Sequence, residues 1–408
     1  MHGVSPLATL PSIGERRPLR ILFVSSTTGG GSGRSQRELN RLVGQLGAET
    51  MMLVDNARGS TLTRFLHEQL WDASVRFADT PVIGESATWL RSIPGRRPSP
   101  LESPADVAGD EHSEQSVLLS PAPENALPDI AITFRPDIVV GSSIARTTWR
   151  TIQETCESLH IPTALYMREE TALGHLFPRP GHDFRRDDLV LANSRTLVDA
   201  AKEYQTEAHF VPSVVDLEAA KVQSTRERIV LVNPRQAHGV EIIEELAPHF
   251  RTIPFVLQES WPLTTKERHM VDSILARHPN VSFRPRTASP AEVFHDAAVV
   301  LVPHLIDNRP RTILEALSNG IPVVANDLPG LVESVGPGGI IVSRPSSWFD
   351  AINKLWQDPV TYRRYQSAAL RYANRKEVQP HNIAYSFLTH VHAAIAERRN
   401  RPINLNQQ

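Results

Sequence analysis

The apolar residues in the first half of the chain gather in short runs, the pattern of strands that are buried on both faces of a sheet. Segments of helix length separate these runs, so a mostly parallel sheet is predicted. One such segment, residues 34–46, has apolar positions spaced three and four apart, as in an amphipathic helix. The strands expected in this half are 21–26, 51–56, 137–143, 162–167 and 189–194.

The second half of the chain repeats this alternation, so two Rossmann-like units are predicted. A segment at 209–220 is expected to cross between them, and the final apolar stretch, 381–399, has the spacing of a helix. The strands expected in the second unit are 228–233, 253–258, 281–283, 298–303, 321–325 and 339–342.

Residues 94–128 interrupt the first unit with many Pro, Ser, Asp and Glu residues and few apolar ones. A segment of this composition buries too little apolar surface to order itself. We therefore predict a mobile inserted loop without regular structure.

The composition narrows the class of protein. With 408 residues the chain is long enough for two domains, and its net charge of −2 gives no reason to expect nucleic acid or an anionic membrane as a partner. Cys156 is the only cysteine, which excludes an intrachain disulfide and favours a reducing compartment. There is no apolar core of a signal peptide and no run of membrane-span length, so a soluble cytoplasmic protein is expected. Peripheral membrane contact and a homodimer remain open.

The stretch 307–330 combines two acids with a helix end and a buried strand. Asp307 and Glu315 are eight residues apart, so one carboxylate lies just before the predicted helix 309–318 and the other about two turns into it. A glycine past the helix end and an apolar run at 321–325 complete an α/β unit. Ligands of open α/β sheets bind at the carboxyl ends of strands, where such acids can accept hydrogen bonds from sugar hydroxyls. For Glu315, a solvated helix face is the alternative.

This stretch resembles the retaining glycosyltransferases of family 4, whose donor site carries Glu-x7-Glu, a Gly-Ile-Pro-Val-Val-Ala strand and an Asp-x-x-Gly-Gly-x-x-Glu turn. Here Asp307 replaces the first Glu, Arg309 and Pro310 replace the usual Phe-Gly, and the turn occupies 327–333. The resemblance covers nearly the whole chain and is strongest in its second half.

The resemblance implies an α/β protein with the GT-B fold: two Rossmann-like domains, a deep cleft between them, and a C-terminal helix that crosses back to the first domain. The expected parts are a flexible N-terminus at 1–18, an N-terminal acceptor domain at 19–213, a nucleotide-sugar domain at 214–378, the crossing helix at 379–398 and a tail at 399–408.

The loop after the first strand of the second unit precedes a predicted helix and contains Asn233, Arg235, His238 and Gly239. Backbone N–H groups at a helix start and the fork of an Arg both suit phosphate oxygens. Many family members have Arg and then Lys-Gly here, so the resemblance implies a diphosphate site in which His238 replaces the Lys. A His carries charge only when it is protonated. The alternatives to phosphate binding are that Arg235 is simply solvated and that His238 caps the helix.

A Gly-rich loop at 27–33 follows the first strand. Its Gly-Ser-Gly begins a dinucleotide fingerprint, and Asp55 lies about 20 residues on, where NAD enzymes bind the ribose. The third glycine of that fingerprint would be Gln36, however. The family resemblance implies instead that this loop approaches the donor diphosphate or the acceptor, and we prefer this interpretation. The donor-binding residues expected here are Gly30 and Gly31.

Acceptor recognition is expected from loops of the first domain. Many family members have a His after the fourth strand, where this chain has Ser142 and Ser143. The loop after the next strand offers Arg168, Glu169 and Glu170, which could bind acceptor hydroxyls or an amine, or form an ordinary charged rim. Of these residues, Ser143, Arg168 and Glu169 are expected to bind the acceptor.

The resemblance implies a retaining transfer, by same-face attack, from a nucleotide-diphosphate sugar to a small-molecule or glycan acceptor. Glu315 would hold the nucleotide ribose, Asp307 the sugar and Arg235 the leaving diphosphate. Further donor-binding residues expected are Asn308 and Arg311. No Asp-x-Asp, His-Glu-x-x-His or Cys-x-x-Cys occurs, so neither a metal nor a cofactor is expected. Two alternatives remain: an NAD-dependent oxidoreductase and a catalytically degenerate GT-B binding protein.

Overall fold

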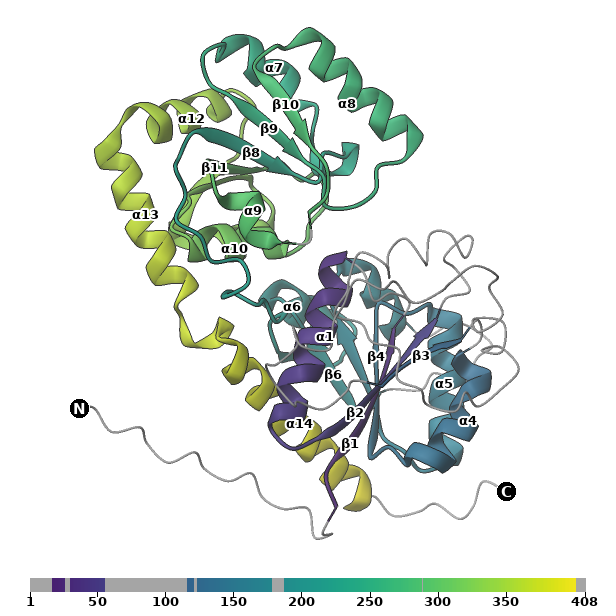
Figure 1. Ribbon diagram of the computed structural model, residues 1–408. Coiled ribbons are helices and arrows are strands. Elements are labelled where there is room, and N and C mark those ends of the chain that lie inside the picture. The colour runs from purple at the N-terminus through teal and green to yellow at the C-terminus, as the bar shows by residue number, and fades with distance from the viewer. Residues whose placement is uncertain are drawn as a thin grey trace, which may run out of the picture.

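The computed structural model describes residues 17–25, 30–55, 116–120, 123–177, 187–287 and 289–400. In these ranges the chain forms two parallel β-sheets, each covered by helices and each with its own apolar core. Figure 1 shows the two α/β domains one above the other, with the yellow end of the chain passing along one side from the upper domain to the lower.

The first sheet contains seven strands, all paired in parallel, in the order β3-β2-β1-β4-β5-β6-β7. Its central strands are almost completely buried, as expected of a sheet with helices on both faces. The strands are β1 (Arg20–Ser25), β2 (Glu49–Asp55), β3 (Ser116–Ser120), β4 (Ile138–Ser142), β5 (Thr163–Met167), β6 (Leu189–Ala192) and β7 (His209–Phe210). The helices are α1 (Gly30–Gln45), α4 (Pro123–Phe134), α5 (Arg146–Ser158), η2 (Glu170–Leu176) and α6 (Arg195–Glu203).

The second sheet has six parallel strands in the order β10-β9-β8-β11-β12-β13. They are β8 (Arg228–Val232), β9 (Phe255–Gln258), β10 (Val281–Arg284), β11 (Ala297–Val302), β12 (Val323–Asn326) and β13 (Gly339–Val342). The helices around it are η3 (Gln236–His238), α7 (Ile242–His249), α8 (Thr265–Arg277), α9 (Pro290–Phe294), α10 (Arg311–Ser318), α11 (Pro329–Val335), η4 (Gly336–Gly338), α12 (Ser347–Gln357) and α13 (Pro359–Ala373). The chain then continues through η5 (Lys376–Val378) into α14 (Pro380–Asn400). Among the residues described, no helix combines the length and the apolar character needed to span a bilayer.

Every strand predicted from an apolar run is a strand of the structure, with its ends shifted by about two residues at most. The two Rossmann-like units that the sequence predicts are therefore confirmed. Both sheets place the first strand of their unit in the centre, so the loops that follow the central strands lie at the carboxyl edge of each sheet, where ligands of such folds bind.

Two predictions are wrong in detail. Residues 94–128 were expected to lack regular structure, but their end forms strand β3 and the first half of helix α4, while 94–115 lies outside the described residues. The Gly-rich segment 27–33 was expected to be a loop, yet helix α1 already begins at Gly30. Residues 27–29 are not among those described.

The final helix completes the core of the first domain. Phe387 of α14 stacks on Phe23 of β1 with ring centroids 5.7 Å apart. Both rings belong to a cluster of fully buried side chains that joins α14 to α1 and to the strands of the first sheet. The crossover of the C-terminal helix that the resemblance implies is thus confirmed.

Phe387→Ala should weaken the attachment of α14 to the first domain. The ring is fully buried, and removing such a ring from a core lowers the free energy of unfolding by about 3–5 kcal/mol. Tyr385→Ala is the control, because this side chain lies on the same helix but is 42 % exposed and should contribute little. Urea unfolding of both variants measures the difference. Equal losses would show that α14 is not part of the core.

Candidate functional site

Arg311 opens helix α10 and binds a carboxylate of each domain. Its Nη1 and Nη2 lie 3.1 and 2.9 Å from Oε2 and Oε1 of Glu38 on α1. Its Nη2 also lies 3.4 Å from Oε1 of Glu315, one turn further along α10. The side chains of Arg311 and Glu315 are each only 9 % exposed. The glutamate that the sequence assigns to the donor ribose is therefore connected to the first domain through one guanidinium.

Burial and charge act in opposite directions on this cluster. Burial disfavours the charged form of Glu38 and raises its pKa, and the neighbouring Arg311 offsets only part of that effect. Burial alone would lower the pKa of Arg311, but Glu38 and Glu315 together raise it above its ordinary value. Arg311 thus stays charged and is the cation that hydrogen-bonds to both carboxylates, while Arg34 of α1 acts on both through its charge alone.

Asp307 holds the turn that follows β12. Its Oδ1 accepts a hydrogen bond from the backbone N–H of Gly330, 2.8 Å away, in the first turn of α11. A Cβ on Gly330 would come within 2.8 Å of the same oxygen, so this close approach requires a glycine. The carboxylate that the sequence assigns to the donor sugar therefore also positions the 327–333 turn.

Arg235 follows β8 and is held by neighbours in its own domain. Its Nη2 donates to the carbonyl oxygen of Pro262 at 2.8 Å, and its Nε lies 3.6 Å from Oε1 of Glu267. The guanidinium carbon also lies 5.6 Å from the ring centroid of Trp261. These contacts fix the direction of the guanidinium on the loop that the resemblance assigns to the donor diphosphate.

The loop after β8 reaches the loop after β11. It first forms the short turn η3, and the helix expected after this loop, α7, begins at Ile242. Gly239 has a φ of +68°, and a Cβ there would lie 2.0 Å from the carbonyl oxygen of Pro303. The N–H of Leu305 donates to the carbonyl of Ala237 at 3.0 Å. A glycine is therefore needed for the two loops to pack together.

Two histidines stack where these loops meet. The rings of His238 and His304 lie 4.2 Å apart with an angle of 13° between their planes. Burial lowers the pKa of His238, and burial together with His238 lowers the pKa of His304 to about 4. Both rings are therefore neutral at pH 7 in this structure. The sequence analysis predicts a role for His238 and overlooks His304.

Two predicted site residues that directly follow central strands have unusual backbone angles. Ser143 after β4 and Asn233 after β8 have positive φ values of 50° and 62°. Non-glycine residues seldom adopt this conformation, and such strain is concentrated at functional sites. The hydroxyl of Ser143 lies 2.9 Å from that of Ser32 in α1.

A pocket of about 270 Å³ lies between the domains. The first domain contributes the start of α6 and the loop after β5, and the second contributes the loop after β11 and the start of α11. Predicted acceptor-side and donor-side residues meet here: Arg168, Glu169, Asp307 and Asn308.

Arg168 is held at this pocket by neutral groups. It is 7 % exposed, and its Nε donates to the hydroxyl of Ser142 at 2.9 Å. Its two Nη atoms donate to Ser35, Ser213 and Gln36 over 3.0 to 3.2 Å. Burial lowers the pKa of Arg168. The network connects the end of β5 to α1, and acceptor binding by Arg168 stays a prediction.

The replacement of the family's Phe by Arg309 produces a contact between the domains. Nη1 of Arg309 donates to the carbonyl of Asn193 at the end of β6, and the guanidinium lies 3.4 Å from Glu333 of α11. Glu333 in turn accepts a hydrogen bond from the backbone N–H of Arg195, 3.0 Å away, at the start of α6. The Arg309–Glu333 pair therefore fixes α6 of the first domain against α11 of the second.

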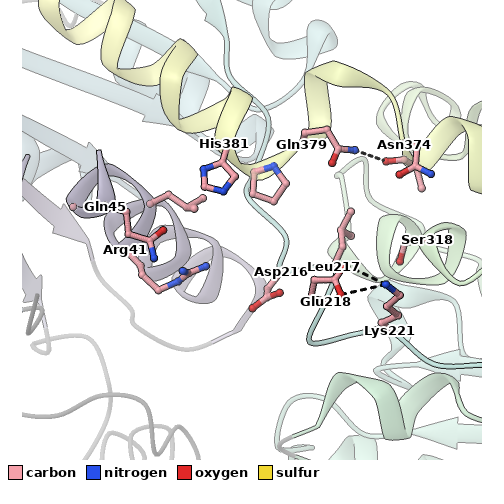
Figure 2. Close-up of a pocket in the computed structure, with 14 residues that line it drawn as sticks. Arg41, Gln45, Asp216, Leu217, Glu218, Lys221, Ser318, Asn374, Gln379 and His381 are labelled. Atoms are coloured by element: carbon pink, nitrogen blue, oxygen red, sulfur yellow. Dashed lines mark hydrogen bonds and ion pairs between the residues drawn. The ribbon is translucent and has the colours of Figure 1, made fainter. Parts of the chain in front are cut away.

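A second cavity, of about 950 Å³, lies where α1, the segment that joins the domains and the start of α14 meet. Figure 2 shows Arg41 and Gln45 of α1 and His381 of α14 on one side, and the Glu218–Lys221 ion pair on the other. None of the residues predicted for the site lines this cavity.

All the predicted residues except Gly30, which begins α1, and Ser143, which contacts Ser32 of α1, therefore fall into three groups. The interdomain pocket holds four of them, the loop after β8 holds Asn233, Arg235, His238 and Gly239, and Arg311 and Glu315 face α1. Gly31 belongs to the third group, because a Cβ there would lie 3.6 Å from Cδ of Arg311. The sequence analysis missed Glu38, Glu267 and His304.

Comparison with known proteins supports this assignment for part of the chain. Residues 262–358 match the family model of glycosyl transferases group 1. Over 87 residues the chain is 37 % identical to D-inositol 3-phosphate glycosyltransferase of Paenarthrobacter aurescens (strain TC1). That match spans 20 % of this chain and only 21 % of the relative. The resemblance to group 1 glycosyltransferases is confirmed for the segment that carries Asp307, Glu315 and the 327–333 turn.

Solved structures confirm the GT-B fold. Sucrose-phosphate synthase from Thermosynechococcus elongatus has a TM-score of 0.65 at 14 % identity, covering 93 % of this chain and 100 % of that one. An O-GlcNAc transferase mutant from Thermobaculum terrenum has a TM-score of 0.57 at 12 % identity, covering 96 % and 71 %. UDP-GlcNAc 2-epimerase from Neisseria meningitidis has a TM-score of 0.54 at 16 % identity, covering 92 % and 100 %. At these identities the likeness shows the fold alone.

Arg311→Ala should leave Glu38 and Glu315 buried without the guanidinium that hydrogen-bonds to both of them. Removing one partner of a buried ion pair lowers the free energy of unfolding by about 3–5 kcal/mol. Protonation of Glu38, whose pKa burial already raises, relieves the repulsion, so the loss should be smaller near about pH 5 than near about pH 8. Urea unfolding at the two pH values measures this difference.

Arg268→Ala is the control for this experiment. Arg268 and Asp272 form an ion pair in which both side chains are about half exposed, and such pairs contribute little. If Arg311→Ala behaves like Arg268→Ala at both pH values, the guanidinium does not stabilise the two carboxylates.

Proposed function

We propose that this chain is a glycosyltransferase that moves a sugar from a nucleotide-diphosphate sugar to a hydroxyl-bearing acceptor, with retention of anomeric configuration and without a metal ion. The match of residues 262–358 to the group 1 family supports the reaction class. The fold supports it as well, because GT-B neighbours that cover more than nine-tenths of this chain include a sucrose-phosphate synthase and an O-GlcNAc transferase.

The observation that carries the proposal is the placement of Glu315. This carboxylate is buried in α10, inside the matched segment, and faces the first domain next to Arg311. Its Oε1 has one long contact of 3.4 Å with that guanidinium, so the carboxylate keeps lone pairs for further hydrogen bonds. The two hydroxyls of a nucleotide ribose are suitable donors for them.

The chemistry requires stabilisation of a diphosphate as it leaves the sugar. Arg235 and the packed loops after β8 and β11 would supply positive charge and backbone N–H groups for it. The acceptor hydroxyl would attack the anomeric carbon on the face from which the diphosphate departs, and its proton would pass to the departing phosphate. This route needs no nucleophile from the protein.

The interdomain pocket is the proposed meeting place of the two substrates. Asp307 and Asn308 would contact the donor sugar from the second domain, while Arg168 and Glu169 would contact the acceptor from the first. A volume of about 270 Å³ is close to the lower end of what small-molecule pockets provide.

A catalytically degenerate binding protein is the second candidate, favoured by the bond from Gly330 to Asp307, which gives one oxygen of the carboxylate assigned to the sugar a structural role. An NAD-dependent oxidoreductase is less well supported. In NAD enzymes the first glycine of the dinucleotide fingerprint lies in the turn before the helix. In this chain that glycine would be Gly31, but Gly31 and Gly33 both lie inside α1.

A thermal-shift screen separates these candidates. One or more of the UDP-, GDP- and ADP-sugars should protect the protein from unfolding, and NADH should not. Transfer to an acceptor, or slow hydrolysis of the protecting nucleotide sugar, in the presence of EDTA would then establish a metal-independent enzyme. Protection without turnover would identify a binding protein, and protection by NADH alone would support the oxidoreductase.

Glu315→Gln should lower turnover or donor affinity about 10- to 100-fold, because hydrogen bonds to a charged acceptor contribute roughly 1.5–3 kcal/mol. Arg311 keeps its bidentate pair with Glu38 in this variant, so the melting temperature should change little. The exposed Glu245→Gln on α7 is the matched control. Wild-type activity in Glu315→Gln would rule out the ribose role.

Arg235→Ala should weaken the binding of UDP by about 10- to 100-fold and leave the binding of uridine unchanged, because only the diphosphate contacts the guanidinium. Isothermal titration calorimetry with both ligands, or with the nucleotides of whichever base binds, provides the comparison. Arg277→Ala, in an exposed pair with Glu244, serves as control. Equal losses for nucleotide and nucleoside would contradict the assignment.

A further inference from the structure

The stacked histidines are fixed through the same atom of each ring. Nδ1 of His238 lies 3.0 Å from the backbone oxygen of Asn233, and Nδ1 of His304 lies 3.0 Å from Oδ1 of Asn308. Both oxygens are acceptors, so each Nδ1 carries the proton in the neutral ring. Neither Nε2 has a hydrogen-bond partner among the residues that the structure describes.

The amide of Asn233 fits the same tautomer of His238. Its Nδ2 lies 3.1 Å from Nδ1 of His238, while its Oδ1 is buried without a partner. Exchange of these two amide atoms gives Nδ1–H a second acceptor and leaves Nδ2 as the buried amide atom without a partner. The basic lone pair of each ring is then on Nε2, where a proton can be added without breaking a hydrogen bond.

Few charged groups on the surrounding elements affect the pKa values of His238 and His304. Arg235 of the same loop lowers the pKa of His238, and Glu267 of α8 raises it, after the larger effect of burial. On His304, burial and His238 lower the pKa, and the hydrogen bond with Asn308 raises it. No fixed opposite charge is strong enough to hold a proton on either ring, so the pair needs an anion to become charged.

We propose that His238 and His304 together form the proton-coupled part of the donor site, taking up one proton from solvent when the diphosphate of a nucleotide sugar binds beside them. The proposal rests on the function proposed above, which assigns the loop after β8 to the diphosphate. The proton adds to Nε2 of one ring, which then donates to a phosphate oxygen. A second proton is disfavoured because two imidazolium rings 4.2 Å apart would repel each other.

The pair of His238 and His304 differs in charge from the Lys that many family members carry at this position. An ammonium is charged whether or not the donor is present, whereas the histidine pair becomes charged only with the anion. The stack gives His304 a part in binding although it lies outside the loop that the family motif describes. The backbone hydrogen bond from Leu305 to Ala237 holds the two rings together.

The test is calorimetric titration of UDP-glucose and GDP-mannose into the wild-type protein between about pH 6 and pH 8, in two buffers with different ionisation enthalpies. The pyrophosphate of these ligands has no proton that titrates in this range, so any proton taken up binds to the protein. We expect uptake of up to one proton, and an affinity that falls by up to about tenfold per pH unit as pH rises through the pKa of the bound state. Wild-type binding without proton uptake would overturn the proposal and leave the proposed function standing.

Three variants assign the proton to the pair. His304→Asn keeps a donor to Asn308 but cannot titrate, and it should reduce the uptake and the slope of affinity against pH. His238→Lys should flatten the pH dependence, because its ammonium stays charged throughout. His390→Asn is the matched control: His390 and His209 form a second stacked pair, 4.3 Å apart, at helix α14, and its loss should not change the uptake.

The remaining outcomes are also decisive. Full proton uptake in His304→Asn would overturn the shared role and assign the proton to His238 alone. The melting temperature of each variant shows whether it is folded, and uridine, which lacks phosphate, should bind without uptake. If neither these nor other nucleotide sugars bind at any pH, the proposed function fails, and the proton-coupled site fails with it.

Discussion

Arg311 holds one positive charge between a carboxylate of α1 and a carboxylate of α10, and all three groups are largely removed from water. In such surroundings the loss of Arg311 would remove the cation that hydrogen-bonds to both carboxylates and leave only the more distant charge of Arg34 on α1 near them. Because the two helices belong to different domains, the same guanidinium that joins the domains also opposes the rise that burial causes in the pKa of Glu38. Separation of the two domains would break the pair between Arg311 and Glu38 and leave Arg311 with Glu315 alone.

The fold was largely predictable because strands buried on both faces leave almost no polar positions, and such runs are visible without any tertiary information. The failures occur where local composition and tertiary pairing disagree. Strand β3 has a short apolar centre within a Pro-rich and acidic region, and it is held by pairing with β2. Helix α4 contains Pro128 and is held by Leu127 and Ile130, which are buried in the core of the first domain. The early start of α1 at its glycines also opposes helix propensity.

The candidate site also has residues that the sequence identifies and residues that only the structure identifies. Asp307, Asn308 and Glu315 could be identified because they lie in one short motif, and the structure places the first two in the interdomain pocket. Their partners could not be identified, since Glu38 is 273 positions from Arg311 and no spacing rule connects them. His304 follows its strand as a single histidine, and only the stack with His238 distinguishes it from an ordinary core residue. The roles of all these residues in substrate binding stay predictions.

Helix α14 affects the order in which the protein can be made. Its apolar face fills the interior of the first domain against β1 and α1, so that interior stays incomplete until the ribosome has translated Phe387 and the residues around it. The second domain has its own core between Ile229 and Leu355 and can fold earlier. During synthesis the second domain should therefore complete its core before the first domain does. Until α14 is synthesised, the first domain exposes the apolar surface that this helix later covers. A nascent chain stalled before α14 should therefore bind chaperones.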